Sequence, residues 1–314
     1  KRITAATNEL PCKHQQGPPR AFRRPSFLHM YVLLLSIGCS VAVSVLLKLA
    51  RSRRFNLSQA IAVNYVAATM LTLGLLQPQP HTLLNNPDAW GLLGALGLLL
   101  PTVFLVMAMA VRHAGIVLSD AAQRLSLLVP LLAAFLIFNE VLTTQKLLGM
   151  ALAFAALVCL LIKKKSFNPN QPRAFLTPLT LIGVWLGYGI IDILFKQLAR
   201  TGSHFATSLL GAFVLAGSFM LVVLLFKKTP WTARNVIAGS LLGVLNFGNI
   251  YFYIRAHQLF PENPSLVFAA MNIGVICTGT LIGAVIFRER LAKVNVIGIA
   301  LAIAALLLLF NAVL

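Results

Sequence analysis

The chain has 314 residues, of which 59% are hydrophobic and 11% are charged. A soluble domain carries about 25% charged residues, so this composition excludes a soluble globular protein and predicts that most of the outer surface faces lipid. The net charge of +19 falls mostly in short gaps between apolar runs. There it indicates membrane topology rather than nucleic-acid binding, and we expect no nucleic-acid partner.

The N-terminal stretch 1–29 differs from the rest of the chain. It is polar, basic and rich in Pro, Gln and Arg, and it has neither a helical period nor the apolar core of a signal peptide. We expect this tail to be disordered and to be an upstream extension, with Met30 as the natural start of the protein. The intact mass of the protein from its native host would test this expectation.

From Met30 onward the sequence contains ten apolar runs of spanning length. A helix rises about 1.5 Å per residue, so about 20 residues cross a hydrocarbon core of about 30 Å. The sequence therefore predicts an all-α integral membrane protein with ten transmembrane helices. The predicted spans are residues 30–50, 57–76, 91–111, 116–138, 146–163, 177–200, 205–226, 235–258, 264–287 and 293–313.

A short motif occurs twice, and its two copies define the expected architecture. Residues 137–142 read Ile-Phe-Asn-Glu-Val-Leu, and residues 286–291, which lie 149 positions further on, read Ile-Phe-Arg-Glu-Arg-Leu. Gly149 and Gly298 follow the two copies in the same register. Each copy lies between the fourth and fifth spans of a five-span half. Because five is odd, the second half must enter the membrane from the opposite side, which predicts an inverted repeat.

The repeat divides the chain into three parts after the tail. We expect a first five-helix half over residues 30–165, a linker over 166–176 and a second five-helix half over 177–314. The linker contains the run Asn-Pro-Asn-Gln-Pro, a composition typical of loops.

These features resemble the EamA-type ten-helix exporters of the drug/metabolite transporter superfamily, over residues 30–314. The resemblance rests on the two five-span halves and on the Glu-containing turn that ends the fourth span of each half. In that family the residue before the glutamate is usually glycine, whereas this chain has Asn139 and Arg288. The resemblance implies a multi-pass transporter of the bacterial inner membrane, which exports or exchanges a small polar or amphipathic metabolite such as an amino acid or a drug.

The repeated glutamates, Glu140 and Glu289, lie in loops near a helix start. A carboxylate at that place can cap the first turn of a helix, so we expect both to be structural. The chemistry should instead lie in the spans, at positions where the two halves differ.

The distribution of basic residues predicts the orientation in the membrane. Most Lys and Arg residues between spans lie in the odd-numbered loops, for example Arg51, Lys163 and Lys227. The positive-inside rule places these loops in the cytoplasm and both termini outside. The resemblance, by contrast, implies cytoplasmic termini. We favour termini outside for a chain that starts at Met30, and a reporter fused after Leu314 would decide between the two.

Ionisable side chains inside a bilayer are costly and usually face the bundle interior or a wet cavity, so the few in these spans are candidate site residues. Asp120 and Arg124 are spaced i,i+4 in the fourth span, as are Asp192 and Lys196 in the sixth. Each pair could bind a proton or a zwitterionic substrate, or could be an ion pair that only joins helices. The two aspartates are the only carboxylates in the predicted spans and are the candidates for a proton carrier. Lys196 could also extend to the near interface.

Amide and aromatic side chains form the second group of candidates. They suit small-molecule sites because rings supply contact area and amides supply orientation. The alternative for each is a role in holding helices together or at the interface. Gln123 and Asn272 are 149 residues apart and could line a cavity from both sides. The other candidates are Asn64, Trp185, Tyr188, Asn246, Asn249 and Tyr253.

Glycines spaced i,i+4 predict two close-packing surfaces, because small residues let membrane helices approach. One pair is Gly183 and Gly187 in the sixth span, and the other is Gly279 and Gly283 in the ninth.

Enzyme motifs are absent from the sequence, which has no Walker loop, no HExxH and no GxSxG. The four cysteines lack metal-ligand spacing, and we expect no metal, no cofactor and no catalytic residue. We therefore expect a secondary transporter that works by alternating access on a small-molecule substrate, as a monomer or homodimer in the lipid bilayer. The alternatives are an uncoupled channel or facilitator, and a receptor or structural membrane protein that transports nothing.

Overall fold

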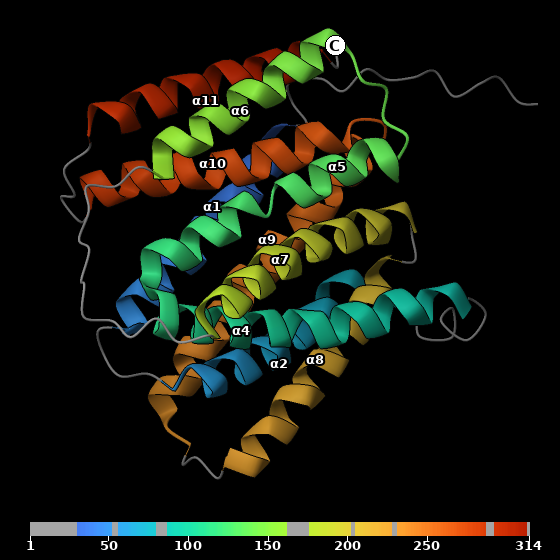
Figure 1. The fold of residues 1–314 in the computed structure, drawn as a ribbon. Helices are drawn as coiled ribbons and strands as arrows, with labels where there is room; N and C mark the ends of the chain where they lie inside the picture. Colours follow the sequence, from blue (N-terminus) through green and yellow to red (C-terminus); the bar gives the residue numbers. More distant parts are fainter. Residues whose placement is uncertain are drawn as a thin grey trace, which may run out of the picture.

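The computed structural model describes residues 30–51, 56–79, 87–161, 176–201, 205–227, 231–286 and 292–312. Within these ranges the regular structure is helical, and the arrangement is shown in Figure 1. The helices are α1 (Met30–Arg51), α2 (Leu57–Leu76), α4 (Pro87–Leu125), α5 (Leu128–Leu136), α6 (Thr144–Leu161), α7 (Leu176–Arg200), α8 (Phe205–Lys227), α9 (Ala233–Leu259), α10 (Pro264–Val285) and α11 (Lys293–Asn311).

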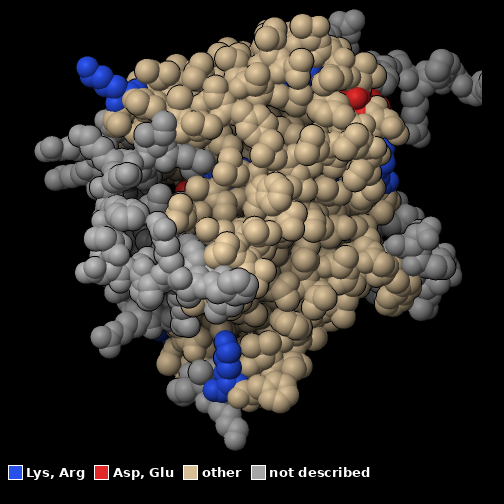
Figure 2. All heavy atoms as spheres, in the orientation of Figure 1, with Lys and Arg blue, Asp and Glu red and all other residues tan. Residues whose placement is uncertain are grey.

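The predicted transmembrane spans are confirmed. In the described part of the chain eight segments are long and apolar enough to cross a membrane, and two shorter apolar helices, Met30–Leu46 and Thr144–Leu160, fall on the first and fifth predicted spans. The face of the molecule in Figure 2 agrees, since most of the surface drawn there carries no charge and Lys and Arg gather at its margins. Large apolar side chains such as Phe226 and Leu136 are exposed, as expected for a surface in contact with lipid. The chain is thus a multi-pass, all-α membrane protein.

The third and fourth spans differ in detail from the prediction, because α4 runs through the end of one and into the next. Two contacts with α7 show that the chain reverses inside this stretch. Val103 lies against Gly187, and the Leu125 carbonyl accepts a hydrogen bond from the Trp185 indole at 3.0 Å, only two residues away along α7. A straight helix would separate residues 103 and 125 by about 33 Å. The two spans are therefore separate crossings, as predicted.

The fourth span is interrupted between α4 and α5, where the sequence predicted one continuous helix. Pro130 has no N–H, so the Ser126 carbonyl lacks its usual donor four residues on. It accepts instead from the Val129 N–H at 3.0 Å, and the Ser126 hydroxyl donates to the Gln123 carbonyl at 2.5 Å. The break is thus a consequence of a proline that is visible in the sequence.

Helices of the two halves interleave rather than form separate bodies. The α1 helix contacts α9 and α10, α2 contacts α8 and α9, α4 contacts α7 and α8, α5 contacts α7, and α6 contacts α11. When each span is exchanged for the span five places away, this set of contacts maps onto itself, since α4–α7 becomes α9–α1 and α2–α9 becomes α8–α4. This is the pattern expected of two related halves.

The α6–α11 contact follows the repeat residue by residue. A Cβ atom on Gly149 would lie 2.7 Å from Leu309 Cγ, and one on Gly298 would lie 2.9 Å from Leu160 Cγ. Both glycines and both leucines are related by the offset of 149 residues. Each contact joins the start of one helix to the end of the other, so the helices are antiparallel. Reciprocal contacts of this kind are the mark of a two-fold axis and support the predicted inverted repeat.

Amide side chains form hydrogen bonds to carbonyls at the C-terminal ends of the same two helices, α6 and α11. The Gln145 amide donates to the Leu308 carbonyl at 3.3 Å, and the Asn295 amide donates to the Cys159 carbonyl at 3.1 Å. The two acceptors are again 149 residues apart. Carbonyls in the last turn of a helix have no partner within it, and such groups are costly in lipid. Each helix therefore supplies a hydrogen-bond donor to a carbonyl at the C-terminal end of the other helix.

The two predicted glycine surfaces have different outcomes. A Cβ atom on Gly187 would lie 2.5 Å from Val103, and one on Gly183 would lie 3.0 Å from Val106, so α7 and α4 do pack closely here. At Gly279, however, an added Cβ would meet nothing within 4 Å, and the prediction of a close contact there is wrong. Spacing alone does not say which glycines face another helix.

Candidate substrate site

The candidate site is built on helices α7, α9 and α10. On α7, Asp192 and Lys196 are one turn apart and face α9. On α9, Tyr253 and His257 are spaced in the same way, so the two pairs can meet along a common line. The sequence places these residues on shared helix faces because the polar positions recur every four residues in otherwise apolar helices.

Asp192 is joined to α9 and α10 by neutral groups. The Tyr253 hydroxyl donates to Asp192 Oδ1 at 3.0 Å. The Asn272 side chain also lies within hydrogen-bond reach of this carboxylate, and its amide donates to the Phe268 carbonyl at 3.2 Å. Asp192 lies eight residues before the end of α7 at Arg200, a depth of about 12 Å along the helix. That depth is close to the middle of the hydrocarbon core.

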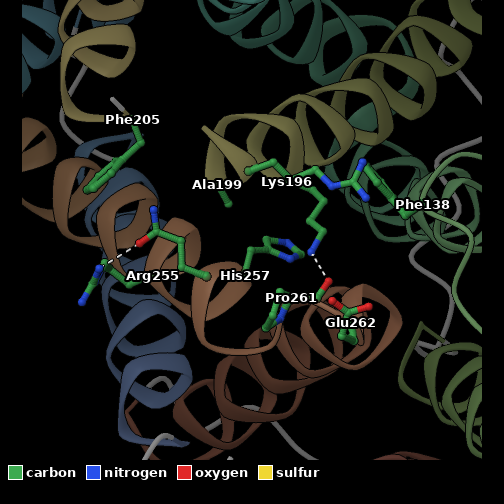
Figure 3. A pocket seen from close by; sticks show the side chains of 10 residues that line it. Phe138, Lys196, Ala199, Phe205, Arg255, His257, Pro261 and Glu262 are labelled. Carbon is green, nitrogen blue, oxygen red and sulfur yellow. Dashed lines mark hydrogen bonds between the residues drawn. The ribbon is translucent and has the colours of Figure 1, made fainter. Parts of the chain in front are cut away.

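Lys196 differs from both sequence-based interpretations. It forms no ion pair with Asp192, and its side chain does not reach an exposed interface, since only 1% of the residue is accessible. Its ammonium donates to the Pro261 carbonyl at 2.7 Å and lies 5.9 Å from the centre of the Phe138 ring (Figure 3). The reason is the loop between α9 and α10, which covers the end of α7 and supplies a neutral acceptor.

His257 is a site residue that does not appear among the candidates predicted from the sequence. Its ring is 1% exposed, and neither ring nitrogen has a hydrogen-bond partner. The ring stands edge-on to those of Tyr253 and Phe268, with centroids 4.8 Å away in each case. Figure 3 shows it beside the end of the Lys196 side chain. The only signal in the sequence was its position one turn after Tyr253.

A cavity of about 490 Å³ opens next to Lys196 and His257. It lies between the C-terminal ends of α7 and α9 and reaches the turn after α5, at Phe138, and the start of α8 (Figure 3). A volume of this size suits a small molecule, for which sites of about 300–1,000 Å³ are usual. The side chains that line it include Phe138, Phe205, Lys196, Arg200, Arg255, His257 and Glu262.

A polar track leads inward from this cavity, and we define it as Lys196, His257, Tyr253, Asp192 and Tyr188. Tyr188 is one turn before Asp192 on α7 and lies close enough to Asp192 to feel its charge. It lies within electrostatic reach of the Asp120–Arg124 pair as well. The track thus joins the cavity to the second pair of charges that the sequence singled out.

Asp120 and Arg124 form the predicted i,i+4 ion pair, with Arg124 Nε 3.5 Å from Asp120 Oδ1. The Asp120 side chain is 42% exposed and that of Arg124 is 15% exposed. Each charge therefore has a compensating partner at hand. The neighbouring Gln123 side chain is half-buried, and no hydrogen bond joins it to Asn272, although both residues lie in the described part of the chain.

The other candidates lie apart from the track. Asn249 accepts hydrogen bonds from the Ser36 hydroxyl at its carbonyl (2.9 Å) and its side chain (3.0 Å), and so holds α9 to α1. Trp185 bonds the Leu125 carbonyl, as described above. Asn246 is buried in α9, and Asn64 is buried in α2 with a side-chain oxygen that has no partner. For Asn249 and Trp185 the geometry favours helix joining over substrate binding.

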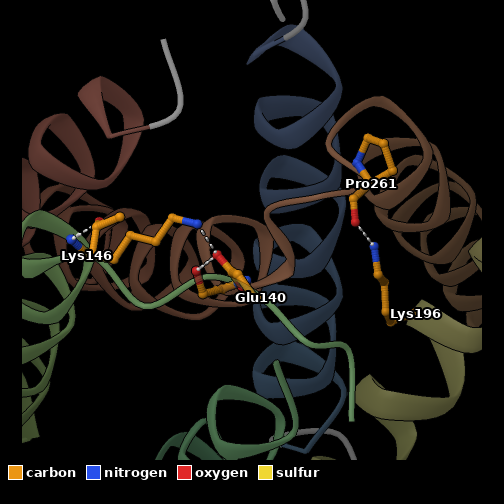
Figure 4. A network of polar contacts seen from close by, with 6 residues as sticks. Glu140, Lys146, Lys196 and Pro261 are labelled. Atoms are coloured by element: carbon orange, nitrogen blue, oxygen red, sulfur yellow. Dashed lines mark hydrogen bonds and ion pairs between the residues drawn. The ribbon is translucent and has the colours of Figure 1, made fainter. Parts of the chain in front are cut away.

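The repeated turn that contains Glu140 forms a separate network of polar contacts (Figure 4). Glu140 is buried and pairs with Lys146 at 2.8 Å. It also accepts from the Ser265 N–H at 2.9 Å and the Ser265 hydroxyl at 2.6 Å. Ser265 is in the first turn of α10, whose own N-cap residue, Asn263, makes no capping bond. The expected capping role is confirmed for Glu140, but the helix it caps belongs to the other half. Glu289 lies outside the described residues.

The described residues offer no group of three His, Cys, Asp or Glu side chains that could hold a metal ion. What the site contains is a half-buried carboxylate, a buried ammonium and ring or amide groups that can form hydrogen bonds. Such a set can bind a small polar molecule and can bind or release a proton.

Comparisons with known proteins agree with this architecture. Residues 28–162 match the model of the EamA-like transporter family. The chain is 51% identical over 289 residues to an uncharacterized protein of Haemophilus influenzae, an alignment that covers 90% of this chain and 98% of that protein. A protein of known crystal structure shares the fold, with a TM-score of 0.66 and 14% identity over 90% of this chain and 96% of that one.

Proposed function

Because this chain belongs to the EamA-like transporter family, within the drug/metabolite transporter superfamily, we propose that it is a secondary transporter. It exports or exchanges a small polar or amphipathic metabolite by alternating access. It works in the bacterial inner membrane.

The observation that carries this proposal is the polar track, which runs from a cavity to a carboxylate about 12 Å deep. Alternating access needs a site near the middle of the bilayer that opens to one side at a time. Asp192, Tyr253 and Tyr188 supply hydrogen-bonding groups at that depth, and the aromatic rings beside them supply contact area. The reciprocal α6–α11 contacts support two halves that can rock about the site.

Of the two aspartates in the spans, Asp192 is a better candidate for the proton carrier than Asp120. Asp120 already has a cation partner in Arg124, whereas the groups that bond Asp192 are a neutral hydroxyl and a neutral amide. Adding a proton to Asp192 therefore removes a charge from the bundle interior without breaking an ion pair. A charged side chain at this depth costs several kcal/mol by most measures, so its neutralisation lowers the barrier to movement of the halves (~2.5 kcal/mol or more).

Transport into proteoliposomes tests the proposal. A thermal-shift screen of the purified protein against amino acids, organic acids and cationic drugs identifies a ligand, and the labelled ligand is then offered to proteoliposomes with an imposed pH gradient. We expect accumulation above the equilibrium level, and its collapse when a protonophore is added. A facilitator would only equilibrate the ligand, and a receptor or structural protein would bind it without transport.

A further inference from the structure

The cavity beside the polar track has an excess of positive charge. Among the described residues that line it, Lys196, Arg200 and Arg255 are cations and Glu262 is a carboxylate. Arg200 and Arg255 are exposed to solvent, whereas Lys196 is buried. Glu140 lies within electrostatic reach of Lys196, but its oxygens are already held by Lys146 and Ser265.

Lys196 makes this excess unusual. Lysine is almost never fully buried without a charged partner. Here a lysine that is 1% exposed has a neutral carbonyl, that of Pro261, as its hydrogen-bond acceptor. An ammonium has three N–H donors, so two remain to bind another acceptor. The arrangement is costly unless an anion is present in the cavity for part of the transport cycle.

His257 is an independent sign of a ligand at the same place. It is buried, it lines the cavity, and neither of its ring nitrogens has a hydrogen-bond partner among the residues that the structure describes. A neutral imidazole carries one N–H donor and one acceptor nitrogen, and leaving such groups buried and unsatisfied is costly. A carboxylate between the His257 ring and the Lys196 ammonium would accept from both.

The side chains that line the cavity indicate the chemistry of the rest of the ligand. Phe138 and Phe205 present aromatic surface to the cavity, and Ala199 adds a small apolar contact. The ring of Phe138 is already covered on one side by the Arg200 guanidinium, 5.1 Å from its centre. An ammonium group on the ligand would add to the positive excess, so the cavity favours a molecule that has a carboxylate and an apolar body but no amine.

We propose that this cavity binds the anionic group of the transported molecule, and that the molecule is an aromatic or branched monocarboxylate without an amino group. The proposal rests on the transport function proposed above and names its substrate class. The bound carboxylate would lie near Asp192 along the polar track, because the Tyr253 ring contacts His257 and the Tyr253 hydroxyl bonds Asp192.

Thermal shift of the full chain in detergent tests the site with four probes: phenylacetate, its neutral analogue phenylacetamide, phenethylamine and inorganic phosphate. We expect phenylacetate to raise the melting temperature with increasing concentration. The amide and the amine should need at least about tenfold higher concentrations for the same rise, since they lack a charge-assisted bond to the ammonium. An equal rise with the amide or the amine would overturn the proposal. So would a rise with inorganic phosphate in the absence of any rise with phenylacetate.

Lys196→Met separates a binding role from a structural one. Methionine keeps the length of the side chain and removes the buried charge, so the ligand-free protein should melt at the same temperature or higher, while the phenylacetate shift weakens about tenfold or more. Lys196→Arg should keep part of the shift. Lys227→Met is the matched control, because Lys227 is an exposed residue at the end of α8 that bonds Ser58 at 3.3 Å, away from the cavity. Lower melting of the free Lys196→Met protein with an unchanged phenylacetate shift would contradict the proposal.

The outcomes for substrate class and for transport are distinct. If phenylacetate binds but no monocarboxylate accumulates in proteoliposomes, the anion site stands and the transport function fails. If an amine or a zwitterion is accumulated and phenylacetate has no effect, transport stands and the anion site fails.

Discussion

Glu140 shows how a single side chain can join the two halves. It is a loop carboxylate from the first half that bonds the first turn of α10 in the second half and pairs with Lys146. A negative charge at a helix N-terminus is favourable, and here it also satisfies N–H groups that the helix cannot satisfy itself. The glutamate of the repeated turn is thus a connection between halves at one end of the bundle.

Glu140→Gln should destabilise the protein by about 3 kcal/mol, because it leaves the buried Lys146 ammonium without its counter-ion. The double variant Glu140→Gln/Lys146→Met should recover much of the loss, since no isolated charge remains. Thermal melting in detergent measures both. A single variant as stable as the parent protein would show that the ion pair contributes nothing.

Asn139, the residue before this glutamate, has a left-handed backbone with φ of 53°. Glycine adopts that conformation freely, asparagine tolerates it and β-branched residues do not. This explains why a glycine is usual here in the family that the sequence resembles, and why asparagine can replace it.

Asn139→Gly should therefore leave stability unchanged or slightly raised, whereas Asn139→Val should lower it by about 1–2 kcal/mol. Chemical denaturation of the two variants side by side provides the measurement. Equal stability of the glycine and valine variants would mean that the left-handed conformation is not required at this turn.

At the scale of helices, the α6–α11 pair is the clearest product of the internal repeat. Its reciprocal glycine–leucine contacts follow the offset of 149 residues, and so do the two carbonyls, of Cys159 and Leu308, that accept amide bonds from the partner helix. The two helices pack on each other through the glycines that follow the repeated turn, so the sequence motif and this close helix contact are parts of one feature.

Gly149→Ala and Gly298→Ala should destabilise the protein by similar amounts, about 1–3 kcal/mol, because each added methyl group would overlap a leucine of the partner helix. Gly279→Ala is the control, since its methyl group meets nothing within 4 Å. Melting temperatures of the three variants decide the matter. Unequal losses at the two repeated glycines would argue against the two-fold relation.

The positions of the helices could be predicted from the sequence far better than the contacts between them. Hydropathy and helix length were enough to place the spans, because a lipid-facing helix must be apolar along most of its length. Spacing also predicted correctly that Asp120 and Arg124 would meet. It could not predict that Asp192 bonds Tyr253 while Lys196 bonds Pro261, because those contacts depend on which helices pack together, over separations of 61 and 65 residues.

At the scale of the whole molecule, the cavity and the Glu140 network lie at the same end of the bundle. Both involve the loop between α5 and α6 and the start of α10 or the loop before it. The two even-numbered loops that the structure describes in full, between α5 and α6 and between α9 and α10, lie at this end. The orientation of the termini thus decides whether the cavity faces the cytoplasm or the outside.

The positive-inside rule predicts that both termini, and this end of the bundle, face the outside. An alkaline phosphatase fused after Leu314 should then be active, and a green fluorescent protein at the same position should be dark. The opposite pair of signals would place the cavity and both termini in the cytoplasm.

The central claim is that Asp192 couples transport to the proton gradient. The most direct measurement is substrate flux in proteoliposomes that contain either Asp192→Asn or its control, Asp120→Asn. We predict that Asp192→Asn loses accumulation driven by the pH gradient but still exchanges labelled for unlabelled substrate, while Asp120→Asn keeps both. Full accumulation by the Asp192→Asn protein would contradict the account.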